Sequence, residues 1–165
     1  DDGASITIDV DSSGRPFVRS VHPHQQLMPV DVSITHSHEL AIAIAARGQC
    51  GIDAQHLNPT LFKVRDRYCL DIERALLDTI AGDELVQLAH LWVAKEALRK
   101  MLSSVQLIGF LEMVLTRVVN HNGLFALFFT LHEPFKHLEE VAVIAHVRAE
   151  YGLAACIISR EQVHA

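Results

Sequence analysis

HLWVAKEALRKM, residues 90–101, contains no glycine or proline and is rich in residues that favour helices. Its apolar side chains recur at a spacing close to 3.6 residues, so the segment is predicted to be a helix with one buried side. Trp92, Glu96 and Lys100 follow one another at intervals of four residues and share one face of this helix. A carboxylate on the buried side, flanked by lysines, suits a metal ion with a phosphate group beside it. The alternative is a core helix on which Glu96 and Lys100 form an ordinary surface pair.

The composition predicts a globular protein of one domain, residues 1–165, in which half of the residues are hydrophobic. A formal charge of -6 argues against a nucleic-acid partner, because phosphate backbones are bound by clustered Lys and Arg. The apolar runs at residues 40–46 and 124–131 are too short to cross a bilayer, so no membrane contact is expected. The three cysteines have no CxxC spacing and indicate free thiols in a reducing, cytoplasmic compartment.

The pattern before residue 60 indicates strands. Residues 6–10 and 16–18 flank turn residues and are predicted to form a hairpin. The segment 21–29 carries prolines without periodicity and is predicted to be a loop. Further strands are expected at residues 32–35 and 50–54, whereas the apolar run 40–46 suits either a buried strand or a short helix.

Helical spacing begins after residue 60, and residues 71–80 are predicted to form an amphipathic helix that ends before Gly82. Asp83 is in the position of an N-cap for the following helix, which contains residues 90–101. The segment 105–119 suits either a strand or a helix. Three more strands complete the chain, at residues 124–131, 141–148 and 151–158.

Asp53 lies at the end of an apolar strand, where a carboxylate is costly to bury unless a cation or a metal ion pairs with it. Gln55 is two residues further on, points to the same side of the strand and offers a neutral oxygen. The alternative is that Asp53 caps the turn that follows the strand.

Four short motifs occur in one order along the chain: Gly-Arg-Pro at residues 14–16, Thr-His-Ser at 35–37, Gly-Ile-Asp at 51–53, and Trp-Val-Ala-Lys-Glu-Ala at 92–97 followed by Lys100. Each motif alone is weak, but the order and the spacing together resemble the 4'-phosphopantetheinyl transferase superfamily. Within this superfamily, the larger, surfactin-synthetase-activating type is the more similar. The resemblance implies an α+β fold in which an antiparallel sheet packs with helices.

The resemblance implies a magnesium-dependent enzyme that moves the 4'-phosphopantetheine arm of coenzyme A to a serine of an apo acyl or peptidyl carrier protein and releases 3',5'-ADP. Asp53, Glu96 and the neutral Gln55 would then hold Mg²⁺, since this ion prefers hard oxygen ligands. Catalysis of phosphoryl transfer rests mostly on positioning and charge neutralisation, a role that suits Lys100. The residues expected at coenzyme A are Arg15, Thr35, His36, Lys95 and Lys100.

Glu73 matches the family glutamate that is proposed to deprotonate the carrier serine, directly or through water. A general base must lie near the hydroxyl group and be partly ionised, as a carboxylate beside a metal ion is. The alternatives are that Glu73 is a solvated helix residue, or that Asp71 is the base.

The chain departs from the family pattern at three points. Gln55 replaces an acidic ligand, Thr35 replaces a serine, and the part before Gly14 is short for the larger type. Residues 49–165 are expected to form the core half, with residues 1–48 as an amino-terminal hairpin and strand part. Because the first residue is Asp1, the domain could also be excised from a larger polypeptide. A homo-oligomer or the other domains of a megasynthase would then complete the cleft.

Two other functions stay open from the sequence. A catalytically weak module of the same fold would bind coenzyme A or a carrier protein without turnover, as the replacement at Gln55 suggests. A structural interaction domain is supported only by the excess of apolar residues. A zinc site formed by His22, His24, His36 and His38 is the least favoured reading, because no cysteine or acid joins them at a recurrent zinc spacing.

Overall fold

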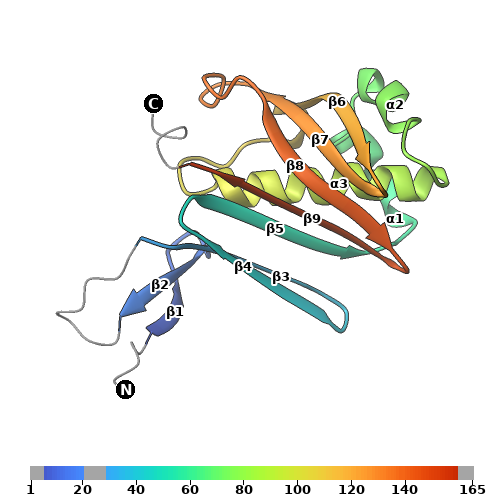
Figure 1. The fold of residues 1–165 in the computed structure, drawn as a ribbon. Helices are drawn as coiled ribbons and strands as arrows, with labels where there is room; N and C mark the ends of the chain where they lie inside the picture. The colour runs from blue at the N-terminus through green and yellow to red at the C-terminus, as the bar shows by residue number, and fades with distance from the viewer. Residues whose placement is uncertain (1–5, 21–28, 160–165) are drawn as a thin grey trace.

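The computed structural model describes residues 6–20 and 29–159, in which one long helix packs against one of two antiparallel sheets (Figure 1). The first sheet has the order β1-β2-β3-β4, and the second has the order β5-β9-β8-β7-β6. The strands of the first sheet are β1 (Ile6–Val10), β2 (Pro16–Ser20), β3 (Asp31–Ser37) and β4 (Leu40–Ala46). Those of the second are β5 (Gln49–His56), β6 (Met113–His121), β7 (Leu124–Leu131), β8 (Val141–Arg148) and β9 (Tyr151–Ile158).

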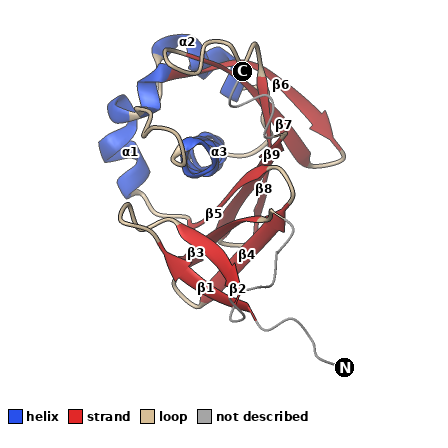
Figure 2. Ribbon diagram, turned by 90° about the vertical axis from the view of Figure 1, so that its left-hand side faces the viewer, coloured by secondary structure: helices blue, strands red, loops and turns tan. Residues whose placement is uncertain are grey.

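The long helix α3 (Glu84–Leu102) packs against one face of the five-stranded sheet, and Figure 2 looks along its axis. The N-cap predicted at Asp83 is present, because its side chain accepts a hydrogen bond from the Val86 N–H at 2.9 Å. The shorter helices α1 (Thr60–Val64) and α2 (Asp71–Leu77) lie on the other side of α3 (Figure 2). Helix α3 is therefore enclosed, which explains why most of its residues between Leu88 and Leu102 are buried.

Helix α3 approaches β5 closely at Gly51. A Cβ atom at this residue would lie 1.9 Å from the Ala97 carbonyl oxygen and 2.8 Å from the Met101 nitrogen. Both contacts are with helix backbone, which cannot move aside as a flexible side chain would. Glycine at position 51 therefore fixes the distance between β5 and α3.

The two sheets meet along β3 and β5, which run side by side without being hydrogen-bonded neighbours in one sheet. Alternate β3 side chains accept hydrogen bonds from alternate β5 backbone N–H groups, an arrangement called the β3–β5 seam below. It joins Asp31 to Cys50 (2.8 Å), Ser33 to Ile52 (3.1 Å), Thr35 to Ala54 (3.2 Å) and Ser37 to His56 (2.9 Å). The seam satisfies the free N–H groups of an edge strand with side-chain oxygens.

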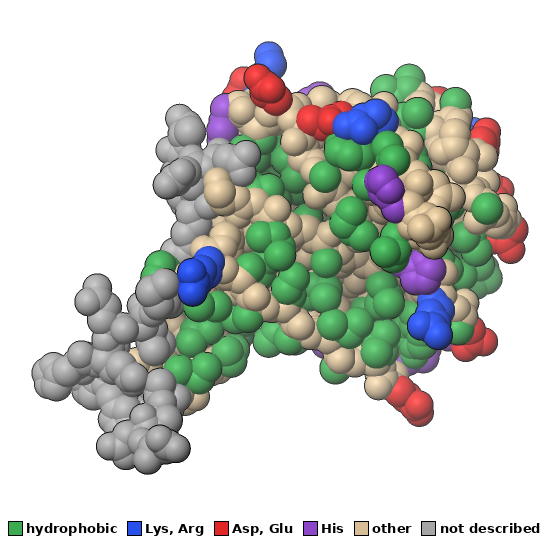
Figure 3. All heavy atoms as spheres, viewed as in Figure 1, with side chains coloured by type: hydrophobic (Ala, Val, Ile, Leu, Met, Phe, Trp, Pro, Cys, Tyr) green, Lys and Arg blue, Asp and Glu red, His purple; other side chains and the backbone are tan. Residues whose placement is uncertain are grey.

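The far face of the five-stranded sheet, opposite α3, carries many apolar side chains. Figure 3 shows hydrophobic residues gathered over β5, β9 and β8 on this face. Two of its large hydrophobic residues are well exposed, Ile144 (47%) and Ile157 (55%). Patches of this kind commonly mark contact surfaces.

The predicted α+β class is confirmed. Residues 40–46 form a strand rather than a helix, with one face turned outward. The helix predicted for residues 71–80 ends earlier, at Leu77, and the segment 105–119 becomes a strand only from Met113 onward. The loop predicted for residues 21–29 lies almost entirely outside the described residues. No helix in the described ranges is both long and apolar enough to cross a membrane.

Candidate active site

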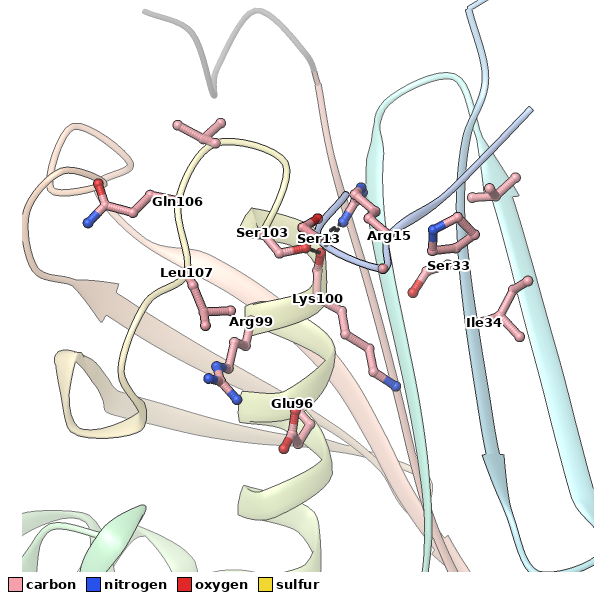
Figure 4. Close-up of a pocket in the computed structure, with 14 residues that line it drawn as sticks. Ser13, Arg15, Ser33, Ile34, Glu96, Arg99, Lys100, Ser103, Gln106 and Leu107 are labelled. Carbon is pink, nitrogen blue, oxygen red and sulfur yellow. Dashed lines mark hydrogen bonds between the residues drawn. The ribbon is translucent and has the colours of Figure 1, made fainter. Parts of the chain in front are cut away.

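A cavity of about 500 Å³ lies between the carboxyl-terminal half of α3 and the first sheet. One wall is formed by α3 and the loop that follows it, and the other by β3 and the turn before β2 (Figure 4). The polar and charged side chains in its lining are Ser13, Arg15, Ser33, Glu96, Arg99, Lys100, Ser103 and Gln106. Little more than one turn of α3 thus supplies a carboxylate and two cations to the same cavity.

Lys100 extends from α3 toward β5 and binds Asp53. Its Nζ lies 2.7 Å from Asp53 Oδ1 and donates a second hydrogen bond to the Ile52 carbonyl oxygen at 3.1 Å. The Thr35 hydroxyl donates to the same Asp53 oxygen at 3.1 Å, while it accepts the Ala54 N–H. Asp53 is only 7% exposed, so it is the buried, paired carboxylate that the sequence predicted rather than a turn cap.

Glu96 lies one turn before Lys100 and lines the cavity (Figure 4). Burial raises the pKa of Glu96, and the negative charge of Asp53 raises it further, while Arg99 and Lys100 oppose the shift. Among the described residues, no hydrogen bond or ion pair reaches the Glu96 carboxylate. Glu96 and Lys100 therefore do not form the ordinary surface pair that was the alternative reading.

The pair of carboxylates Asp53 and Glu96 fits a divalent cation. They repel each other, as the raised pKa of Glu96 indicates, and a hard cation between them would remove this repulsion. The part of the chain that the structure describes contains no group of three or more His, Cys, Asp or Glu side chains placed to bind a metal ion. Two carboxylates are nevertheless enough for Mg²⁺, which usually keeps several waters and substrate phosphate oxygens in its shell.

Arg15 borders the cavity, but its guanidinium group is already engaged. It lies 2.6 Å from Asp31 Oδ2, donates to Ser103 Oγ at 3.0 Å and also binds the Lys100 carbonyl oxygen. These contacts fasten the turn before β2 to the carboxyl-terminal end of α3, where a cation is favoured by the helix dipole. The predicted contact of Arg15 with a nucleotide stays a prediction.

Arg99 is a cation of the cavity that the sequence reasoning missed. Its Nε donates to the Ile108 carbonyl oxygen at 3.2 Å, and its guanidinium carbon lies 4.9 Å from the centre of the Phe110 ring. Within the described ranges, Arg99 forms no ion pair, so its terminal N–H groups are free for an anionic ligand. The spacing of four residues that singles out Glu96 and Lys100 skips Arg99, which lies beside their helix face rather than on it.

Glu73 and Lys95 lie together in the core rather than at the cavity. Lys95 Nζ is 2.8 Å from Glu73 Oε1, and both side chains are 0% exposed. Lys95 also donates to the carbonyl oxygens of Tyr68 (2.7 Å) and Phe110 (3.2 Å). Glu73 accepts the backbone N–H groups of Leu70 and Leu115, each at 2.7 Å. Burial lowers the pKa of Lys95, and the Glu73 carboxylate opposes that shift.

The remaining predicted site residues lie apart from this cluster. His36 is exposed on β3 and points to the face opposite Thr35, as the alternation of a strand requires. Gln55 is half-buried, and its side-chain amide donates to the His56 carbonyl oxygen at 3.0 Å. Of the predicted set, the structure thus brings together Thr35, Asp53, Glu96 and Lys100, with Arg15 at the border.

The fold and the motif order are those expected of a protein of the phosphopantetheinyl transferase class. The family model described as the 4'-phosphopantetheinyl transferase superfamily matches residues 49–156, and the chain belongs to this superfamily. The comparison with curated proteins gives no match.

Among solved structures, the holo-[acyl-carrier-protein] synthase of Thermotoga maritima is similar, with a TM-score of 0.51 and 20% sequence identity. The match covers 68% of this chain and 63% of the synthase chain. At this identity the likeness establishes the fold, and the matched part spans less than two thirds of the synthase.

Proposed function

We propose that the protein transfers the 4'-phosphopantetheine arm of coenzyme A to a serine of an apo acyl or peptidyl carrier protein and releases 3',5'-ADP. The observation that carries this proposal is the cavity in which Glu96, Arg99 and Lys100 meet, in a chain that belongs to the phosphopantetheinyl transferase superfamily. Its volume of about 500 Å³ is within the range of small-molecule sites.

In this proposal, the serine oxygen forms a bond to the phosphorus that carries the pantetheine arm, and the bond from that phosphorus to 3',5'-ADP breaks. Asp53 and Glu96 would hold Mg²⁺, which when bound neutralises charge on the diphosphate. Lys100 and Arg99 supply two further positive charges, one on each side of Glu96 (Figure 4). The walls of the cavity hold the diphosphate in place for the attack.

The transfer needs an acceptor for the serine proton, and the sequence predicts Glu73 for this role. Glu73 could accept this proton only if its ion pair with Lys95 opened, because both side chains are fully enclosed. Its two backbone hydrogen bonds also stabilise the carboxylate in its present place. These contacts support a structural role for Glu73 and Lys95.

We also propose that the chain is similar to the surfactin-synthetase-activating type. We propose further that it divides into an amino-terminal part, residues 1–48, and a core half, residues 49–165. The change of sheet between β4 and β5 and the start of the family match at residue 49 support that division. The apolar far face of the five-stranded sheet supports an assembly, either with further copies or with other domains. The mass of the protein in solution, measured by light scattering, tests for further copies.

The transfer is tested by incubating the protein with Mg²⁺, coenzyme A and a panel of apo carrier proteins, followed by mass spectrometry of the carriers. The expected result is a carrier heavier by one phosphopantetheine group, with loss of this product in Glu96→Ala. If no carrier gains the group while calorimetry detects coenzyme A binding, the chain is instead the catalytically weak binding module. Absence of both transfer and binding contradicts both functions.

A further inference from the structure

We propose that Lys100 is an internal counter-cation: it occupies the Asp53 side of the divalent-cation site in the free protein and moves to the phosphate groups of the nucleotide when the metal ion binds. This inference rests on the proposed function, because it concerns the same cavity and the same ligands. It adds a coupling between two binding events that neither the fold nor the family membership supplies.

The charged groups at Asp53 include an ammonium group on the side where a metal ion would bind. The Lys100 ammonium group lies 2.7 Å from Asp53 Oδ1, where a metal ion held by Asp53 and Glu96 would have to approach. Asp53 Oδ2 and both Glu96 oxygens have no hydrogen-bond partner among the described residues. Lys100 thus neutralises one of the two carboxylates and leaves the other, Glu96, without a partner.

The Lys100 side chain is free to move away from Asp53. Its side chain is 32% exposed, whereas the Asp53 side chain is 9% exposed. A lysine has four rotatable bonds and a compact charge, so its ammonium group can move from Asp53 into the cavity that the side chain already lines. Asp53 stays in place because the Thr35 hydroxyl holds the same oxygen.

Displacement of Lys100 from Asp53 changes the free energy of metal binding. A divalent cation that binds alone meets the positive charge of Lys100 at Asp53, so it either displaces the ammonium group or binds through Asp53 Oδ2 against that repulsion. When the nucleotide is present, its phosphate oxygens accept the displaced ammonium group. The metal ion and the nucleotide therefore strengthen each other's binding, and by linkage the factor is the same for both.

The test measures binding rather than turnover. Calorimetry at fixed ionic strength gives the affinity for Mg²⁺ alone, for coenzyme A alone and for Mg²⁺ in the presence of coenzyme A. For the unaltered protein, we expect coenzyme A to tighten Mg²⁺ binding on the order of tenfold, within the usual range of coupling between sites. For Lys100→Met, we expect tighter binding of Mg²⁺ alone and a smaller coupling factor, which then comes only from direct contact between Mg²⁺ and the phosphate oxygens.

Arg99→Met is the matched control, because Arg99 is a cation of the same cavity whose guanidinium group is held by Ile108 and Phe110 rather than by Asp53. If loss of any nearby positive charge were enough, both variants would bind Mg²⁺ alone more tightly and to the same extent. The proposal requires that the coupling factor fall in Lys100→Met and stay unchanged in Arg99→Met. Circular dichroism and thermal unfolding establish that both variants are folded, and Lys100→Gln serves in place of the methionine variant if that one is not.

Two results would overturn the inference. One is Mg²⁺ binding and coupling in Lys100→Met that equal those of the unaltered protein; the other is a lack of Mg²⁺ binding in every variant. Failure of the proposed function looks different, since Mg²⁺ and coenzyme A would bind with the expected coupling while no carrier protein gains the phosphopantetheine arm.

Discussion

Lys95 and Glu73 form an ion pair at 2.8 Å with both side chains fully buried, and this pair joins α2, α3 and the start of β6. Each partner is also hydrogen-bonded to backbone groups, Lys95 to two carbonyl oxygens and Glu73 to two N–H groups. A buried charge of this kind is tolerated only while its partner and its hydrogen bonds stay in place. The pair therefore has a structural role, because it holds α2, α3 and β6 together.

Removal of one partner is expected to destabilise the protein strongly. Lys95→Met leaves the Glu73 carboxylate buried without its cation, and Glu73→Gln does the reverse. Each change should lower the free energy of unfolding by about 3–5 kcal/mol, as measured by urea denaturation. The double variant should lose less than the sum of the two, because neither charge remains.

The matched control for that experiment is the exposed ion pair between Arg117 and Glu140, whose nitrogen and oxygen lie 2.6 Å apart. Arg117→Met should change the free energy of unfolding by about 1 kcal/mol or less. Equal effects in Arg117→Met and Lys95→Met would contradict the structural role of the buried pair. If Glu73→Gln stays folded but transfers no phosphopantetheine, Glu73 is the base that the sequence predicted.

Thr35 is expected to act on the site through Asp53. Thr35→Val removes the hydroxyl group that holds Asp53 Oδ1 and leaves the Ala54 N–H without its acceptor. The expected loss is about 1–3 kcal/mol of unfolding free energy. Weaker binding of Mg²⁺, measured by calorimetry, should accompany it, since Asp53 is no longer held in place.

Thr35→Ser keeps the hydroxyl group and should stay within about 1 kcal/mol of the unaltered protein. It should also retain Mg²⁺ affinity. A valine variant that is destabilised but binds Mg²⁺ normally would show that Thr35 belongs to the β3–β5 seam alone and has no part in placing Asp53.

Glu96 is expected to reduce stability as the pH rises. Its pKa is raised in the folded protein, first by burial and then by Asp53, above the ordinary value of 4.5. The folded state therefore favours the protonated form, and the penalty for ionisation begins near pH 4.5 and is complete above the folded pKa. Without divalent cations, Glu96→Gln should melt roughly 1–3 °C higher at pH 8, with no difference at low pH.

Glu140→Gln supplies a control of opposite sign, because the hydrogen bond from Arg117 lowers the pKa of Glu140. That interaction stabilises the protein above the unfolded pKa and is lost as the pH falls. Glu140→Gln should therefore melt lower than the unaltered protein at pH 8. A Glu96→Gln variant that also melts lower at pH 8 would contradict the assigned environment of Glu96.

The elements with a strong local signal could be predicted from the sequence. The helix around residues 90–101 and its cap at Asp83 follow from spacing and from one side chain that reaches its own backbone. The segments that stayed ambiguous are those in which tertiary contacts decide between a helix and a strand. The continuous apolar run 40–46 has no period that distinguishes a strand from a helix. Its pairing with β3 in the folded protein selects the strand.

Some residues around the cavity could be singled out from the sequence, but their contacts could not. Asp53, Glu96 and Lys100 carry motif signals, so they could be found without a structure. The partners of Arg15 and Lys95 could not, because Asp31 and Glu73 come to them only when distant elements pack. The alternation of Asp31, Ser33, Thr35 and Ser37 was visible in the sequence, but a polar face toward an edge strand looks the same as a polar face toward water.

Gly51 links the packing of the core to the geometry of the site. A Cβ atom at this position would meet the Ala97 carbonyl oxygen at 1.9 Å, so Gly51→Ala must push α3 away from β5. We expect a loss of about 2–3 kcal/mol in unfolding free energy, measured by urea denaturation. Lys100 is on the displaced helix and Asp53 on the strand, so Mg²⁺ binding should change as well.

Gly152→Ala is the control for this change. Its Cβ atom would meet the Val93 side chain at 3.2 Å, and a side-chain methyl group can shift where a helix carbonyl cannot. The expected loss is below about 1 kcal/mol, without an effect on the contact between Lys100 and Asp53. If both alanine variants are equally stable, the spacing between α3 and β5 is not set by Gly51. If only Gly51→Ala loses both stability and Mg²⁺ affinity, the same close approach that packs the helix also brings its lysine to the carboxylate.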